Sequence, residues 1–280
     1  MTMLVFGQTG QVAQELARQG SVMCLGRDRA DLSAPGTCAA AIHALSPSAV
    51  INAAAYTAVD RAEQDEPLAH IVNATAPAAM AQACAELGIP FLHISTDYVF
   101  DGSGTIPWAV NAPTAPLNAY GRSKLAGETA IRVTGAKAAI LRTSWVFSAH
   151  GANFVKSMLR LSETRNALSI VNDQIGGPTP AASIAATLLT MAKGMCAGQE
   201  GGTYHLAGAP VASWECFARE TFRLAGQNVT VTGIPTADYP TPARRPLNSR
   251  LDCSMLESDF GIPAPDWRTG LRDVLKDLNI

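Results

Sequence analysis

Residues 3 to 13 read Met-Leu-Val-Phe-Gly-Gln-Thr-Gly-Gln-Val-Ala. Four apolar residues run directly into a glycine-rich segment, and a helical pattern begins at Gln11. This order predicts a buried strand, a tight turn, and a helix whose N-terminus presents free backbone N–H groups. Such a turn binds phosphate, because the N–H groups and the helix dipole both favour an anion. The spacing Gly7-x-x-Gly10-x-x-Ala13 is a weak signal alone, but its position after an N-terminal strand strengthens it.

Short apolar runs and helical segments alternate over the first 150 residues. Strands are predicted at 3–6, 22–25, 49–54, 91–95, 138–146 and, further on, 203–206. Helices are predicted at 11–18, 36–45, 67–87 and 119–133. The strands are apolar almost throughout, as expected of parallel strands that are covered on both faces. The pattern predicts an α/β fold, a Rossmann-type doubly wound parallel sheet.

The pattern changes after Gly151, where proline and glycine become frequent. Helices are predicted there at 183–193, 214–225 and 270–278. We expect residues 1–150 to form the nucleotide-binding Rossmann domain, together with parts of 168–208 that return to the sheet. Residues 151–280 are expected to form mainly a smaller C-terminal substrate-binding portion on the edge of the sheet.

The composition limits the class of protein. The 280 residues are 48% hydrophobic and 16% charged, with a formal net charge of −2, which favours a small-molecule protein over a nucleic-acid or membrane partner. Apolar runs are too short to span a membrane, and the N-terminus lacks the pattern of a signal peptide. Six cysteines without CxxC spacing predict reduced thiols in a cytoplasmic protein, and five scattered histidines predict no histidine-based metal site.

The second predicted strand ends at Leu25 and is followed by Gly26 and Arg27. A nicotinamide site selective for the unphosphorylated ribose usually carries an acid at this place. Arg27 offers a cation to a 2′-phosphate, which favours NADPH, with NADH as the alternative cofactor. A solvated surface arginine is about equally expected. Asp31 and Leu32 follow, where they can flank an adenine.

Tyr120 and Lys124 are four residues apart at the start of a predicted helix, so they project from one face. An ammonium beside a phenol stabilises the phenolate and lowers the pKa of the tyrosine, as a carbonyl reductase requires. The spacing alone is common by chance. Ser95 and Thr96 strengthen it, because they end the fourth predicted strand, and ligands bind at the carboxyl ends of parallel strands. A hydroxyl there can polarise a substrate carbonyl.

The chain resembles the extended short-chain dehydrogenases/reductases, and within them the dTDP-4-dehydrorhamnose reductase family. Matching motifs occur in order along essentially the whole chain: Asn52 to Glu63, Ser95-Thr-Asp-Tyr-Val-Phe-Asp-Gly102, Tyr120-Gly-Arg-Ser-Lys-Leu-Ala-Gly-Glu128, Arg142 to Phe147, Asn153 to Lys156, Asp173-Gln174 with Gly177-Pro178-Thr179, and Arg245 to Ser249. The resemblance implies NAD(P)H-dependent reduction of the C4 keto group of dTDP-4-dehydro-L-rhamnose to dTDP-L-rhamnose, a precursor of surface polysaccharide.

The resemblance also implies a role for each matching residue. Tyr120 corresponds to the proton donor, Thr96 to the hydroxyl that assists it, and Lys124 to the tyrosine activator and ribose ligand. The cofactor-binding positions are Gly7, Thr9, Gly10, Gln11, Val12, Arg27, Asp31, Leu32, Ala53, Ala55, Tyr56, Thr57, Tyr120 and Lys124. The substrate-binding positions are Val59, Thr96, Asp97, Tyr98, Trp145 and Arg245, although most tryptophans on apolar strands are core residues.

Some members of the family bind magnesium between subunits through glutamates. Glu15 is available here, but Ala181, Ala182 and Ser183 stand where the second acid is expected. This departure puts a bridging magnesium ion in doubt and leaves a homodimer open.

Two alternative functions remain at this point: a related 4-keto nucleotide-sugar reductase of other specificity, and a non-catalytic NADP-binding regulatory subunit. The nucleotide-sugar substrate carries two phosphates, for which basic side chains in the C-terminal portion are candidate ligands. These are Lys156, Arg160, Arg244, Arg245 and Arg250, each nearly as expected to be a solvated surface residue.

Overall fold

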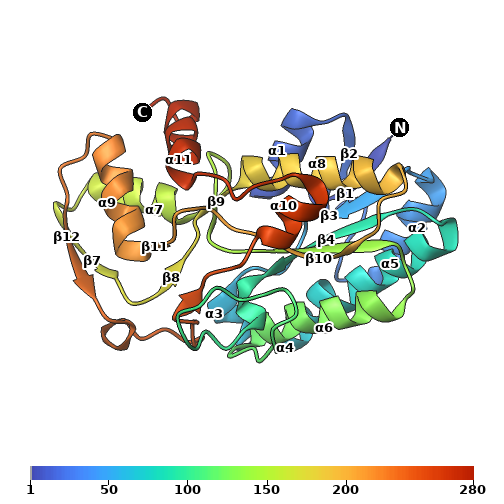
Figure 1. Cartoon of the computed structure of the whole chain (residues 1–280), viewed down its shortest axis with the longest axis horizontal. Coiled ribbons are helices and arrows are strands. Elements are labelled where there is room, and N and C mark those ends of the chain that lie inside the picture. Colours follow the sequence, from blue (N-terminus) through green and yellow to red (C-terminus); the bar gives the residue numbers. More distant parts are fainter. Residues whose placement is uncertain (1) are drawn as a thin grey trace.

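The computed structural model describes residues 2–280. Its centre is a six-stranded parallel sheet in the order β10-β5-β4-β3-β1-β2 (Figure 1). The strands are β1 (Met3–Phe6), β2 (Val22–Leu25), β3 (Ala49–Asn52), β4 (Phe91–Thr96), β5 (Ala138–Thr143) and β10 (Gly202–Leu206). The predicted doubly wound sheet is therefore confirmed. The chain reverses direction across the sheet between β1 and β3, and ligands of such sheets bind at that switch point.

Helices cover both faces of this sheet, because its strands are apolar on both sides (Figure 1). One face packs against α1 (Gln11–Gln19) and α8 (Ala181–Cys196), which contribute Leu16, Ile184 and Leu188 to a common core. The other face packs against α2 (Pro35–Leu45), α5 (Ala76–Leu87) and α6 (Ala119–Val133), which contribute Ile42, Met80 and Ile131. The sheet ends are thereby left free to form a site.

The helix predicted at 67–87 differs from the structure. It consists of α4 (Glu66–His70), a π-helical segment η1 (Ile71–Thr75) and α5. Pro77 has no N–H to donate to the carbonyl of Asn73, which accounts for the wider turn there. A short helix α3 (Val59–Ala62) precedes this segment.

The strand predicted at 49–54 ends two residues earlier, at Asn52. The strand predicted at 138–146 ends at Thr143 and is followed by a separate short strand, β6 (Val146–Phe147). Both shortened ends leave loop backbone at the edge where the switch point lies.

The C-terminal portion is built from short elements around a second core. They are α7 (Phe154–Ser162), β7 (Ala167–Val171), β8 (Ile175–Gly176), β9 (Thr179–Pro180), β11 (Ala212–Ser213), α9 (Trp214–Leu224), β12 (Thr230–Ile234), β13 (Asn248–Ser249), α10 (Ser254–Phe260) and α11 (Trp267–Asp277). Phe147, Phe217 and Trp267 lie at the centre of this core. The chain crosses back between the two portions, because β10 pairs with β5 at the edge of the central sheet (Figure 1).

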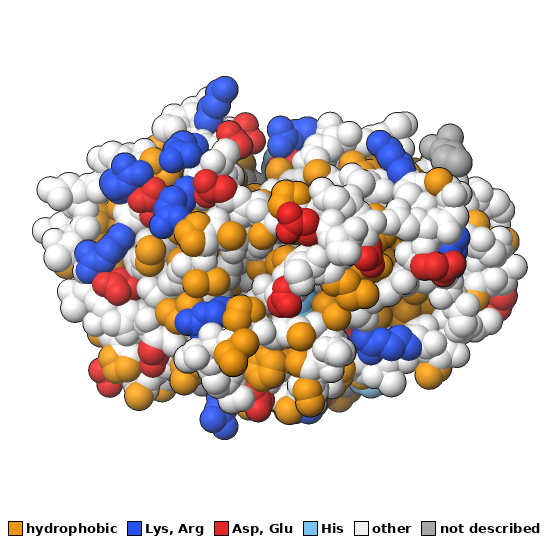
Figure 2. All heavy atoms as spheres, in the orientation of Figure 1, with side chains coloured by type: hydrophobic (Ala, Val, Ile, Leu, Met, Phe, Trp, Pro, Cys, Tyr) orange, Lys and Arg blue, Asp and Glu red, His pale blue; other side chains and the backbone are white. Residues whose placement is uncertain are grey.

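The surface mixes charges of both signs, and Figure 2 shows Lys, Arg, Asp and Glu side chains side by side at the end that carries α9 and α11. Within residues 2–280, no helix has the length and apolar character that crossing a membrane requires. The six cysteines are free thiols, as the sequence predicts.

Candidate active site

A cleft of about 860 Å³ opens at the carboxyl ends of the central strands. It is lined by most of the predicted site residues: Gly7, Thr9, Gly10, Gln11, Val12, Arg27, Asp31, Leu32, Ala53, Ala55, Thr57, Val59, Thr96, Asp97, Tyr98, Tyr120, Lys124 and Trp145. The structure therefore brings the glycine-rich turn and the tyrosine–lysine pair into one cavity, of a size that suits a ligand.

The glycine-rich turn has the geometry of an anion cradle. Gly7 has a φ of +114°, which L side chains rarely adopt, and a Cβ there would lie 3.4 Å from the backbone of Ala53. Gly10 caps α1 without any side-chain cap, so the first N–H groups of the helix keep their hydrogen-bonding capacity. Gln11 Oε1 accepts hydrogen bonds from Ser148 Oγ (2.9 Å) and Asn153 Nδ2 (3.0 Å), which ties this turn to the C-terminal portion. The turn fits the diphosphate of a dinucleotide.

Arg27 lies at the far end of the cleft with its side chain 84% exposed, and its Nε lies 3.8 Å from Asp31 Oδ1. Hydrogen bonds from Ser33 hold the pKa of the Asp31 carboxyl below its usual range. Tyr56 does not line the cleft. Its hydroxyl donates to Asp65 Oδ2 (3.1 Å) and its backbone N–H donates to Asn73 Oδ1 (2.8 Å). Its cofactor-binding role therefore stays a prediction.

The start of α6 positions Tyr120. Asn118 caps the helix by accepting a hydrogen bond from Gly121 N (2.8 Å) through its Oδ1, and its Nδ2 donates to the carbonyl of Arg244 (2.7 Å). Gly121 is required at this place, because a Cβ would lie 2.3 Å from the carbonyl oxygen of Tyr98. This close approach brings Tyr98 and Tyr120 together edge to face, with 5.7 Å between their ring centroids.

The electrostatics of Tyr120 differ from the expectation. Burial raises the pKa of the Tyr120 hydroxyl, an effect that the facing Thr96 hydroxyl opposes and the charge of Asp97 adds to. Lys124 does not lower the pKa of Tyr120 as expected, because Lys124 Nζ instead contacts His93 Nε2 (3.0 Å) and the carbonyl of Ile94 (2.7 Å). A raised pKa keeps the tyrosine protonated, which suits a proton donor.

Two buried side-chain oxygens have no hydrogen-bond partner among the described residues, and both belong to residues that line the cleft. They are Asp97 Oδ2 and Thr143 Oγ1. Burial raises the pKa of Asp97 to about 6, although hydroxyls of Ser249 and Thr96 oppose this. Because buried polar atoms normally find partners, these two mark the wall where a polar ligand completes the site.

An aromatic stack closes the cleft toward the C-terminal portion. Trp145 and Trp214 stack with 3.7 Å between ring centroids and 11° between planes. Trp145 has a φ of +49°, a conformation that is uncommon outside glycine and that recurs at functional sites. Trp214 Nε1 donates to Gln174 Oε1 (3.1 Å), which fixes the second ring.

Three residues that line the cleft were not predicted from the sequence as site residues: Thr143, Ser144 and Trp214. Thr143 and Ser144 follow the end of β5, so the rule that parallel strand ends bind ligands points to them. Trp214 carried no such signal, since it begins a helix far along the chain.

The five basic residues predicted for the diphosphate do not line the cleft. Arg245 pairs with Asp60 through two contacts, of 3.0 and 2.8 Å. Lys156 Nζ donates to the carbonyl of Ala149, and Arg250 Nη1 donates to Asn248 Oδ1. The substrate-binding role of Arg245 stays a prediction, and so do the roles of Arg160 and Arg244.

Glu15 does not fit a magnesium ion. Its Oε2 accepts hydrogen bonds from Arg18 Nη2 (2.7 Å) and Gln19 Nε2 (3.1 Å), and its Oε1 lies 3.4 Å from His150 Nε2. Within residues 2–280, no group of three or more His, Cys, Asp or Glu side chains is placed to hold a metal ion. Glu15 Oε2 is thus already engaged by a guanidinium and an amide, and Oε1 faces the imidazole of His150.

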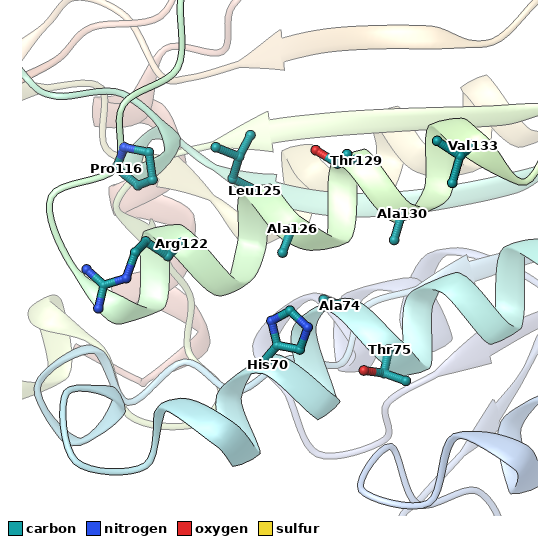
Figure 3. Close-up of a pocket in the computed structure, with 10 residues that line it drawn as sticks. All are labelled: His70, Ala74, Thr75, Pro116, Arg122, Leu125, Ala126, Thr129, Ala130 and Val133. Carbon is teal, nitrogen blue, oxygen red and sulfur yellow. The ribbon is translucent and has the colours of Figure 1, made fainter.

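A separate depression of about 560 Å³ lies between α6 and the segment of α4 and η1 (Figure 3). Leu125, Ala126 and Ala130 of α6 line it. At 3.6 residues per turn, these residues project from a different side of α6 than Tyr120 and Lys124. The depression therefore lies on the face of α6 turned away from the cleft.

The fold and the cleft define an NAD(P)-dependent oxidoreductase of the short-chain dehydrogenase/reductase class. The family model described as RmlD substrate binding domain matches residues 1–280. The chain is 45% identical over 295 residues to "dTDP-4-dehydrorhamnose reductase" of Burkholderia thailandensis, with 99% of each chain covered.

Solved structures agree with this match. A dTDP-4-dehydrorhamnose reductase from Clostridium acetobutylicum is 34% identical, with a TM-score of 0.94 over 100% of both chains. One from Bacillus anthracis, in complex with NADP, is 31% identical, with a TM-score of 0.92 over 99% of both chains. The chain belongs to the dTDP-4-dehydrorhamnose reductase family.

Proposed function

We propose that the protein reduces the C4 keto group of dTDP-4-dehydro-L-rhamnose to the alcohol, with NADPH as the preferred cofactor, and so supplies dTDP-L-rhamnose for surface polysaccharide. The observation that carries this proposal is the shared cleft. An anion-binding turn at one end and the Thr96–Tyr120 pair further along line the same cavity. The names of the relatives supply the substrate.

The residues present fit a nicotinamide dinucleotide. Gly7, Gly10 and Gln11 would hold its diphosphate, and Asp31 and Leu32 would flank its adenine. When bound, the nicotinamide supplies the hydride. We assign NADPH rather than NADH as the preferred cofactor because the exposed Arg27, whose Nε lies 3.8 Å from Asp31 Oδ1, can turn toward a 2′-phosphate, and Gly26 introduces no negative charge.

Tyr120 supplies the proton in this proposal. Its protonated hydroxyl lies beside the Thr96 hydroxyl, which helps to orient the substrate carbonyl oxygen. Hydride on the carbon and the Tyr120 proton on the oxygen convert the ketone to a secondary alcohol, so charge and atoms balance. We assign Lys124 to the nicotinamide ribose. Because it lines the same cleft, its ammonium would also favour the negative charge that Tyr120 acquires once its proton has been transferred.

The stacked indoles of Trp145 and Trp214 provide an apolar wall for the sugar. One of the two indoles, Trp214, comes from residues 151–280, to which we assign substrate binding. We also place the protein in the cytosol, because six unpaired thiols suit a reducing compartment.

The test is a spectrophotometric screen of NADPH oxidation against 4-keto nucleotide sugars that differ in base and in sugar stereochemistry. The expected result is the highest kcat/KM with dTDP-4-dehydro-L-rhamnose and a product identified by NMR as dTDP-L-rhamnose. A higher kcat/KM with another nucleotide sugar would reassign the substrate. NADPH binding without turnover of any of them would instead identify a regulatory subunit.

A further inference from the structure

His93 lies in the middle of β4, fully buried, and has no part in the proposed chemistry. Its imidazole contacts one polar side chain at each nitrogen. Asn52 Nδ2 lies 3.1 Å from His93 Nδ1, and Lys124 Nζ lies 3.0 Å from His93 Nε2. A buried titratable ring therefore stands directly behind the lysine of the site.

The neighbouring backbone fixes the direction of these hydrogen bonds. The N–H of Ala54 donates to Asn52 Oδ1 (3.2 Å), so the amide of Asn52 turns its NH₂ group toward His93. His93 Nδ1 then accepts, and a neutral imidazole that accepts at one nitrogen carries its hydrogen on the other. The Nε2–H of His93 consequently points at Lys124 Nζ.

The surroundings of Lys124 agree with this direction. Burial and the proximity of Lys124 hold the pKa of His93 well below its usual range, so the ring is neutral. Burial lowers the pKa of Lys124 to about 8, and the charge of Glu128 opposes that change.

Other titratable groups surround the lysine. Tyr120 lies on its own helix, Asp97 follows β4, and Arg142 of β5 is engaged by Glu128. Within this set, the charge of Glu128 favours the ammonium. An imidazole N–H that faces Nζ favours the neutral amine, because a hydrogen bond to the neutral form disfavours the charged one.

We propose that His93 is a positioning residue that tunes Lys124: its Nε2–H faces Nζ, so it can donate a hydrogen bond to the neutral amine, whereas the ammonium can make no hydrogen bond with it. This inference rests on the proposed function, in which Lys124 serves Tyr120 and the ribose. A partner that donates to Nζ disfavours the ammonium. His93 therefore adds to burial in lowering the pH above which Lys124 loses its proton, and with it the pH of the alkaline limb of turnover.

The first test measures the tautomer of His93. The chain has five histidines, so a ¹⁵N-histidine NMR spectrum resolves few resonances, and His93 is assigned by its loss in His93→Gln. Should that variant fail to fold, single variants at the other four histidines assign it by elimination. The expected result is a neutral ring with hydrogen on Nε2 from about pH 6 to about pH 9. Hydrogen on Nδ1 would overturn the proposal.

The second test measures the protonation of Lys124 in ¹³C-lysine-labelled protein, which has five lysines. In His93→Gln the amide oxygen can turn toward Nζ and accept from the ammonium. The titration midpoint of Lys124 and the alkaline limb of kcat should both rise by about one pH unit, the size of one hydrogen bond to a charged group.

The matched control is His205→Gln, since His205 is an equally buried histidine that contacts Arg142 rather than Lys124. It should leave the midpoint unchanged. A Lys124 midpoint that does not move in His93→Gln would contradict the proposal. Both NMR measurements need no substrate, so their failure is distinct from a failure of the proposed reaction.

Discussion

Replacing Glu128 tests how α6, the helix that carries Tyr120 and Lys124, is fastened to the sheet. The Glu128 carboxylate is fully buried and accepts hydrogen bonds from Arg142 Nε (2.8 Å) and Nη2 (2.7 Å) and from Ser95 Oγ (2.6 Å). The exposed Arg132 adds a fourth, of 2.8 Å. The substitution Glu128→Gln keeps the shape of the side chain but leaves the buried guanidinium of Arg142 without its counter-charge.

The expected cost follows from burial. Breaking a buried ion pair by removing one partner costs about 3–5 kcal/mol. The cost should lie at the lower end of this range, because Arg142 keeps a hydrogen bond to the carbonyl of Val110 (3.1 Å) and lies over the ring of Phe100. We expect a loss of about 3 kcal/mol in the free energy of unfolding and a fall in Tm of about 6–12 °C.

Urea and thermal unfolding followed by circular dichroism provide the assay. Arg132→Ala is the matched control and should cost under about 1 kcal/mol, because that partner is half-exposed. Combining Glu128→Leu with Arg142→Met should cost less than the sum of the two single changes, since no charge is left buried. A loss of less than about 1 kcal/mol in Glu128→Gln would refute this reasoning.

Three further predictions concern pH, the substrate and the cofactor. Burial and the charge of Arg142 lower the pKa of His205 to about 4, so the folded protein binds this proton less readily than the unfolded chain. The contribution of neutral His205 to the free energy of unfolding is complete above about pH 6.5 and is lost as the pH falls toward 4. Urea titrations at several pH values should therefore show a shallower pH dependence of stability in His205→Gln than in the wild type. Trp214→Ala should raise KM for the nucleotide sugar by about three- to tenfold, because the stack with Trp145 is lost. The control Trp214→Phe should stay closer to the wild type. A change in NADPH affinity alone would contradict this assignment. Arg27→Ala should abolish most of the preference for NADPH, measured as the ratio of kcat/KM with NADPH to kcat/KM with NADH. Added salt should weaken that preference in the wild type, because Arg27 is exposed. Equal kcat/KM values for the two cofactors in the wild type would exclude the role of Arg27.

Most of the central sheet was predictable from sequence because its signals are local. The apolar strands β1, β2 and β4 and the helix α6 were predicted to within one or two residues of their ends. The two-residue strands β8, β9, β11 and β13 were not predicted, because two residues show no periodicity. The π-helical turn before Pro77 was not predicted, because one five-residue turn is too short to interrupt the helical pattern of 67–87 visibly.

The candidate site likewise has features that the sequence spacing predicts and contacts that only the folded structure shows. Tyr120 and Lys124 are four residues apart, so their common helix face could be read from spacing. The contact of Lys124 with His93 joins residues 31 positions apart on different elements, and only the packing of α6 on β4 reveals it. The pairing of Arg245 with Asp60 joins residues 185 positions apart, and spacing pointed instead to a phosphate ligand.

The proton donor is the centre of this account, and the most direct test is turnover by Tyr120→Phe. NADPH oxidation with saturating dTDP-4-dehydro-L-rhamnose should fall by about 10²–10⁴-fold, because general acid catalysis contributes that much. The Kd for NADPH should stay near the wild-type value, since the ring and its edge-to-face contact with Tyr98 remain. A Tyr120→Phe enzyme that turns over at close to the wild-type rate would contradict the account.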